Sequence, residues 1–152
     1  MLKTKIAVFV SGGGTNFEAL INALENGKIP HGEIVLMVSS SKTAYALKRA
    51  ENHGIKSVVC SKKELGSQES FEEEILKNLE ENDIQLIVLA GFMSILSKEF
   101  TKKYENRIIN IHPSLIPSFC GEGFYGRHVH EAALKKGVKV TGATVHIVNE
   151  IP

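Results

Sequence analysis

The chain has 152 residues, which is the size of one domain with a single hydrophobic core. Acidic and basic side chains nearly cancel and leave a formal net charge of +1, so the broad basic surface of a nucleic-acid or membrane-surface binder is absent. The N-terminal apolar run, residues 6–10, is too short for a secretory signal or a membrane span, and Cys60 and Cys120 lack metal-ligand spacing. We therefore expect a cytoplasmic protein that binds no nucleic acid, no membrane and no metal.

Short apolar runs alternate with helical patterns along the chain, which is typical of a parallel sheet with crossover helices. The predicted strands are residues 5–10, 33–39, 56–59, 85–90, 107–111 and 139–148. The predicted helices are residues 16–26, 43–53, 67–81, 94–104 and 127–136, and the acidic run of the third is expected to face solvent. The fold class is α/β, a doubly wound, mostly parallel sheet with helices on both faces. Such sheets bind ligands beyond the carboxyl ends of their strands.

The segment Ser11-Gly-Gly-Gly-Thr-Asn16 connects the first predicted strand to the first predicted helix. Its backbone amides and the helix N-terminus form a candidate anion cradle, and the alternative is a flexible connection. No lysine follows the glycines as in a P-loop, and the third glycine of a dinucleotide fingerprint is missing, which argues against a nicotinamide-dependent oxidoreductase. A single phosphate monoester therefore fits this turn better than a nucleotide does.

Asn110 and His112 lie at the end of the fifth predicted strand. Residues two apart on a strand point to the same side of the sheet, so this pair could share one substrate atom. An amide donor beside a group that titrates near neutrality suits a reaction that builds negative charge on a carbonyl oxygen and moves a proton. The pair predicts acyl-group transfer, and the alternatives are a core histidine and a strand-end amide.

Two further segments could contribute to a site. Residues 90–96 follow another strand end and are expected either to wall a flat aromatic ligand or to pack in the core. Residues 118–126 are rich in glycine and aromatic side chains, which is typical of a functional loop, and Cys120 within them is expected to be incidental. The other histidines are expected to be structural or at the surface: His31, His53, His128, His130 and His146.

Taken together, five motifs resemble the phosphoribosylglycinamide formyltransferases, the folate-dependent enzymes of purine synthesis. The motifs are Ser11-Gly-Gly-Gly-Thr-Asn16, Leu89-Ala-Gly-Phe-Met93, Asn110-Ile-His-Pro-Ser-Leu-Ile-Pro117, Gly123-Phe-Tyr-Gly126 and Val140-Thr-Gly-Ala-Thr-Val-His146. The asparagine-histidine-proline-serine-leucine motif resembles the wider folate formyltransferase superfamily. The opening glycine motif narrows the resemblance to the glycinamide ribonucleotide enzymes.

The resemblance implies that a formyl group passes from 10-formyltetrahydrofolate to the amine of glycinamide ribonucleotide by direct attack, without a metal. It implies that Asn110 contacts the folate and donates to the oxyanion, while His112 stabilises the oxyanion and serves in proton transfer. The implied phosphate-binding residues are Gly13, Gly14, Thr15 and Asn16, the implied folate-binding residues are Met93, Ser94, Ile95 and Leu96, and Thr144 is expected to position water. Family members occur as monomers and homodimers, so either state is expected.

The chain departs from the family pattern near its end. The aspartate that partners the histidine at position 112 in the family lies seven residues beyond the residue that matches His146, one position past Pro152. Glu150 matches a different acidic residue of the family. We therefore expect residues 1–152 to form a single formyltransferase domain whose C-terminal portion is missing, with weak activity at best.

Two substitutions bear on folate binding, because Gln68 replaces a basic residue that meets the folate tail in relatives and Cys120 replaces a proline. Two alternative functions remain. One is a related folate enzyme that uses water or aminoacyl-tRNA as the formyl acceptor. The other is a non-catalytic fragment that binds phosphate or folate.

Overall fold

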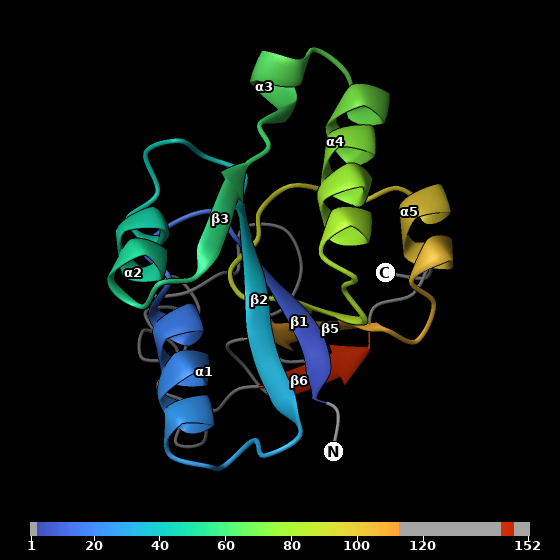
Figure 1. The fold of residues 1–152 in the computed structure, drawn as a ribbon. Helices are drawn as coiled ribbons and strands as arrows, with labels where there is room; N and C mark the ends of the chain where they lie inside the picture. Colours follow the sequence, from blue (N-terminus) through green and yellow to red (C-terminus); the bar gives the residue numbers. More distant parts are fainter. Residues whose placement is uncertain (1–2, 113–143, 148–152) are drawn as a thin grey trace, which may run out of the picture.

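The structure is a computed structural model that describes residues 3–112 and 144–147, with the side chains of residues 3–110. Its centre is a six-stranded sheet with the strand order β3-β2-β1-β4-β5-β6 (Figure 1). The strands are β1 (Thr4–Val10), β2 (Gly32–Ser39), β3 (Lys56–Val59), β4 (Leu86–Leu89), β5 (Ile108–His112) and β6 (Thr144–Ile147). The first five are parallel, and β6 is antiparallel to β5. The predicted doubly wound, mostly parallel sheet is confirmed.

Helices cover both faces of this sheet. They are α1 (Thr15–Glu25), α2 (Ala46–Asn52), α3 (Lys62–Leu65), α4 (Gln68–Glu81) and α5 (Lys98–Lys103). The helices α1 and α2 pack on one face, while α4 and α5 pack on the other (Figure 1). In the described part of the chain, no helix has the length and apolar character needed to cross a membrane.

The strand order reverses between β1 and β4, because β2 and β3 follow on one side of β1 and β5 follows on the other side of β4. The carboxyl ends of β1 and β4 therefore form a topological switch point. Open α/β sheets bind their ligands in the crevice at such a point.

Alternate side chains of the strands enter two hydrophobic cores, as the period of two requires. Val8 packs with Phe17 of α1 on one face, and Phe9 packs with Phe71 of α4 and Phe100 of α5 on the other. All five side chains are fully or almost fully buried. Full burial of each contributes about 1.5–3 kcal/mol to folding, so the central strand β1 is anchored from both sides.

Two predicted helices begin later than expected. α2 begins at Ala46 rather than at residue 43, because the Ser41 hydroxyl accepts the Thr43 amide at 3.2 Å and holds a turn in place of a helix. α5 begins at Lys98 rather than at residue 94, because Ser97 caps it by accepting the Phe100 amide at 3.2 Å.

Other differences concern short or undescribed segments. The single-turn helix α3 was not predicted, since four residues carry no periodic signal. β6 confirms part of the predicted strand 139–148, whereas the predicted helix 127–136 lies outside the described residues.

The helix α4 confirms its predicted buried stripe and most of its predicted solvent-facing acidic run, with one exception. Phe71, Ile75 and Leu79 form its buried stripe as expected. The acidic run is expected to face solvent, and Glu69, Glu73, Glu80 and Glu81 do so, whereas Glu72 is only 8% exposed. Its position next to Phe71, at the margin of the stripe, turns its carboxylate toward residues after β4 rather than toward water.

Cys60 generates a prediction about reactivity. Burial, with a smaller effect from the Glu74 carboxylate, raises the pKa of the Cys60 thiol to about 11. Since the thiolate is the reactive form, a chromogenic disulfide reagent at pH 8 should label Cys60 far more slowly in the folded protein than in urea. The folded state favours the protonated thiol, so this contribution to stability is complete below about pH 8.5. It is lost as the pH rises through the folded-state pKa.

The measurement uses a Cys120→Ser variant, in which Cys60 is the remaining cysteine. Labelling of Cys60 at the same rate with and without urea would contradict the prediction.

Candidate functional site

The turn between β1 and α1 presents an open backbone beside a helix N-terminus. Gly14 is the N-cap of α1 with φ of 77°, and no side chain caps the first turn. A Cβ added to Gly12 or Gly13 would meet nothing within 4 Å, so the space over them is open. Thr15 and Asn16 begin the helix, and their amides point along its axis out of the N-terminus. This is the arrangement with which proteins bind anions.

Charged side chains from α2 shape the same turn. The Arg49 Nε atom donates to the Gly13 carbonyl at 2.7 Å, and Arg49 Nη1 lies 3.5 Å from a Glu18 carboxylate oxygen. His53 Nε2 lies 2.7 Å from the other Glu18 oxygen, and His53 Nδ1 lies 3.4 Å from Glu25. A carboxylate in the first turn of α1 would compete with a bound anion. The guanidinium offsets that negative charge while it holds the turn.

The segment 91–97 after β4 lies next to this turn. The Met93 amide donates to the Ser11 hydroxyl at 2.8 Å, and the Ile95 carbonyl accepts from Gln68 Nε2 at 2.9 Å. Met93 and Ile95 are 59% and 81% exposed, so core packing, one of the two expectations for this segment, is wrong for them.

The rest of the segment is arranged differently. Phe92 and Leu96 are partly buried against the core, and Ser94 lies on the chain between Met93 and Ile95. Partly buried side chains therefore anchor the segment at the switch point, while Met93 and Ile95 expose apolar surface there. We call residues 93–96 the apolar wall.

Asn110 and His112 lie on β5, immediately beside β4. Asn110 pairs with Leu89, the last residue of β4. The antiparallel register with β6 places Thr144 opposite His112 and His146 opposite Asn110. The side chains of His112 and Thr144 lie outside the described part, as do all of residues 113–143 and 148–152, which include Cys120 and Glu150.

Sequence reasoning missed the side chains that hold these segments in place. Arg49 belongs to no motif, and 36 residues separate it from Gly13. The sequence predicts Glu72 to be a solvated acid of α4, and the structure buries it. Gln68 matches the position of a basic residue that meets the folate tail in relatives, and its amide nitrogen donates to Glu72 and to the Ile95 carbonyl. Only Ser11 lay within a recognised motif.

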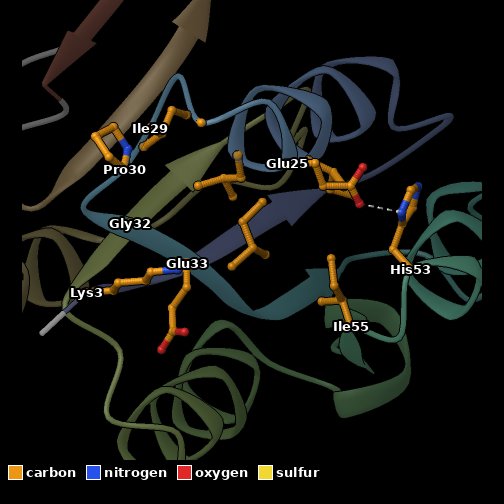
Figure 2. A pocket seen from close by; sticks show the side chains of 12 residues that line it. Lys3, Glu25, Ile29, Pro30, Gly32, Glu33, His53 and Ile55 are labelled. Carbon is orange, nitrogen blue, oxygen red and sulfur yellow. Dashed lines mark ion pairs between the residues drawn. The ribbon is translucent and has the colours of Figure 1, made fainter.

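A pocket of about 350 Å³ lies at the opposite edge of the sheet, where β1 and β2 begin (Figure 2). Its walls include Ile29, Pro30 and Ile55, with the Glu25–His53 ion pair at one side. None of the predicted site residues lines it. Ligands of doubly wound sheets bind at the carboxyl edge, so we place the candidate site there and not in this pocket. Within residues 3–112 and 144–147, no cluster of His, Cys, Asp or Glu side chains could hold a metal ion.

The fold and the site define a doubly wound α/β protein with a glycine turn and an apolar wall at its switch point. The sequence profile of the formyl transferase family matches residues 4–151. The chain belongs to this family.

Known relatives agree with that assignment. The chain is 47% identical over 148 residues to trifunctional purine biosynthetic protein adenosine-3 of Gallus gallus, covering 97% of this chain and 14% of that protein. It is 35% identical over 149 residues to the chloroplastic phosphoribosylglycinamide formyltransferase of Arabidopsis thaliana, covering 97% of this chain and 51% of that protein. The chain thus spans about half of the plant relative and a smaller part of the chicken protein.

Solved structures show the same likeness. The crystal structure of phosphoribosylglycinamide formyltransferase from Brucella melitensis matches with a TM-score of 0.88 and 42% identity, over 97% of this chain and 74% of that chain. The resemblance seen in the sequence is confirmed. A formyltetrahydrofolate deformylase from Pseudomonas syringae also matches, with a TM-score of 0.80 and 25% identity, over 97% of this chain and 47% of that chain.

The environment of Gly14 predicts a stability effect. A Cβ at Gly14 would lie 2.7 Å from the Ala46 Cβ atom, and its φ is positive. We expect Gly14→Ala to lower the free energy of unfolding by about 2–4 kcal/mol, from left-handed strain and overpacking together. Gly27→Ala is the matched control, because Gly27 has φ of 74° but open space around it, and should cost about 1 kcal/mol.

Urea titration of both variants measures the difference. Equal losses in the two variants would show that contact with Ala46 does not constrain the turn.

Proposed function

We propose that this chain transfers a formyl group from 10-formyltetrahydrofolate to the amine of glycinamide ribonucleotide, in de novo purine biosynthesis. One observation carries the proposal: the glycine turn after β1 and the apolar wall after β4 are joined by the 2.8 Å hydrogen bond between Ser11 and Met93. An anionic ligand and a flat apolar ligand can therefore bind side by side. Membership of the formyl transferase family and the names of the relatives support it.

The binding roles follow from the two segments. Gly13, Gly14, Thr15 and Asn16 would hold the ribonucleotide phosphate at the N-terminus of α1. Met93, Ser94, Ile95 and Leu96 would wall the pterin, with Met93 and Ile95 offering their exposed apolar surface.

The chemistry would take place at the end of β5. The substrate amine attacks the formyl carbon, a C–N bond forms, and the carbonyl electron pair moves to oxygen. Asn110 would donate a hydrogen bond to this oxyanion, and His112 would stabilise it. Collapse of the intermediate breaks the bond to folate N10, and His112 would carry the amine proton toward that nitrogen. Thr144, opposite His112 in the register, would position water for the transfer.

One alternative function is a related folate enzyme that uses water as the formyl acceptor. The match to a formyltetrahydrofolate deformylase supports this alternative. An aminoacyl-tRNA acceptor and a non-catalytic fragment that binds phosphate or folate are the other two. The absence of a metal, the monomeric or homodimeric state and the cytoplasmic location stay predictions, and the Arabidopsis relative is chloroplastic.

The test is release of tetrahydrofolate by the full-length natural protein, supplied with glycinamide ribonucleotide, aminoacyl-tRNA or water alone. We expect turnover that requires glycinamide ribonucleotide. Asn110→Ala and His112→Ala should each lower kcat by about 10²–10³-fold, because each removes a group that acts in the transition state. Equal release in water alone would favour a hydrolase, and folate binding without release would favour a binding protein.

Arg49 provides a separate prediction about the phosphate site. Arg49→Gln removes the hydrogen bond to Gly13 and the positive charge beside the turn. We expect the KM for glycinamide ribonucleotide to rise about fivefold or more, which corresponds to loss of about 1 kcal/mol. The KM for 10-formyltetrahydrofolate should stay within about twofold.

Lys48→Gln is the matched control, because it removes one positive charge from the same helix at a side chain whose ion-pair partner is Glu51, on the same helix. The same rise in KM in both variants would show that the net charge of α2, and not the contact with Gly13, is responsible.

A further inference from the structure

The carboxylate of Glu72 is buried and holds three hydrogen bonds from neutral donors. Its Oε2 atom accepts from the Ser97 amide at 2.6 Å and from Gln68 Nε2 at 2.8 Å, while Oε1 accepts from the Ser97 hydroxyl at 2.5 Å. Within residues 3–110 no lysine, arginine or histidine forms an ion pair with it. A carboxylate removed from water in this way is stable only while its donors stay in place. Glu72 therefore constrains the position of every group bound to it.

Two of the three donors to Glu72 belong to Ser97, at the end of the segment 91–97, and the third belongs to Gln68 of α4. Gln68 connects Glu72 to the middle of the segment, because the Gln68 amide nitrogen donates both to Glu72 and to the Ile95 carbonyl. Both partners are acceptors, which fixes the orientation of the Gln68 amide. At the other end of the segment, Ser11 accepts the Met93 amide.

The segment is thus fixed through its backbone while its apolar side chains stay exposed. Met93 and Ile95 have few protein contacts of their own to hold them, as their exposure shows. Side chains that bind a flat ligand must keep their positions before the ligand arrives, because ordering them on binding costs affinity. Glu72 and Gln68 can supply this constraint through their hydrogen bonds to the segment, and we call these two residues the polar clamp.

We propose that Glu72, acting with Gln68, is a positioning residue that holds the Met93–Leu96 wall in the geometry that binds the folate co-substrate. This inference rests on the proposed function, because it takes the wall as the folate site. Glu72 does not touch the substrate. It acts through Ser97 and through the Gln68 contact with the Ile95 carbonyl.

A purely structural reading is that Glu72 only caps the start of α5. Ser97 already caps that helix through the Phe100 amide, and the Gln68 contact with Ile95 serves no helix end. The two readings differ in what they predict for the two substrates. A cap affects overall stability, whereas a clamp affects the folate and spares the ribonucleotide.

The test compares Glu72→Leu with Glu73→Leu in the full-length natural protein. Leucine has a similar volume but no acceptor atoms, and Glu73 is exposed on the same helix. For Glu72→Leu we expect the dissociation constant of tetrahydrofolate, measured by calorimetry, to rise about five- to twentyfold. The KM for glycinamide ribonucleotide should stay within about twofold, and the amides of residues 93–97 should exchange with solvent at least about tenfold faster. Glu73→Leu should change none of the three.

A second pair of variants covers the case in which Glu72→Leu does not fold. Gln68→Ala removes the contact with Ile95 at a partly exposed position, and Glu69→Ala is its exposed neighbour. Weaker tetrahydrofolate binding together with faster exchange of the amides of residues 93–97, in Gln68→Ala alone, supports the clamp. Weaker binding with unchanged exchange would show a direct contact of Gln68 with the folate and overturn it.

Unchanged tetrahydrofolate binding in a folded variant of Glu72 or Gln68 overturns the inference, and so does an equal loss of both substrates. Failure of the proposed function is recognised separately in the unsubstituted protein, which would then release tetrahydrofolate without glycinamide ribonucleotide or would not release it at all, whatever the variants of Glu72 and Gln68 do to tetrahydrofolate binding.

Discussion

The parallel pairing of β1 with β4 is the constraint on which the candidate site depends. Their register runs from Ile6 opposite Leu86 to Phe9 opposite Leu89, so both strands end at the same edge of the sheet. The chain leaves them in different directions, toward α1 and toward α5. Ser11 and Met93 can meet only because the strands that precede them are neighbours. Two segments 82 residues apart thereby become one surface.

Long polar side chains of neighbouring helices hold that surface in shape. Arg49 reaches from α2 to the glycine turn, and Glu72 reaches from α4 to the end of the wall. The ion pair of Arg49 with Glu18 is partly exposed, and such pairs add little to stability. Arg49 and Glu72 instead fix the positions of the segments that they contact. The turn keeps an uncapped helix end, and the wall keeps apolar side chains in water, so both stay open to a ligand.

Much of the fold could be predicted because its signals are local. Short apolar runs and helical stripes identified β1 to β5 and the four longer helices, and the succession of elements implied a parallel sheet. The site was partly predictable for the same reason. The glycine turn and the Asn110–His112 pair are short motifs at the carboxyl ends of predicted strands. In a parallel sheet these ends lie along the same edge, where ligands bind. Helix starts were less predictable, because serine hydroxyls near residues 41 and 97 decide them through individual hydrogen bonds.

The fold class, the family resemblance and the segments that carry the candidate chemistry follow from the amino-acid sequence, because each depends on residues that are close together along the chain. Tertiary structure alone decided which side chains support them. Glu72 is buried rather than solvated because the segment after β4 folds over it. Arg49 contacts Gly13, and Thr144 lies opposite His112, across distances in the chain that no periodic pattern spans. Such contacts arise from packing of elements distant in sequence, and only the assembled sheet brings them within hydrogen-bonding reach.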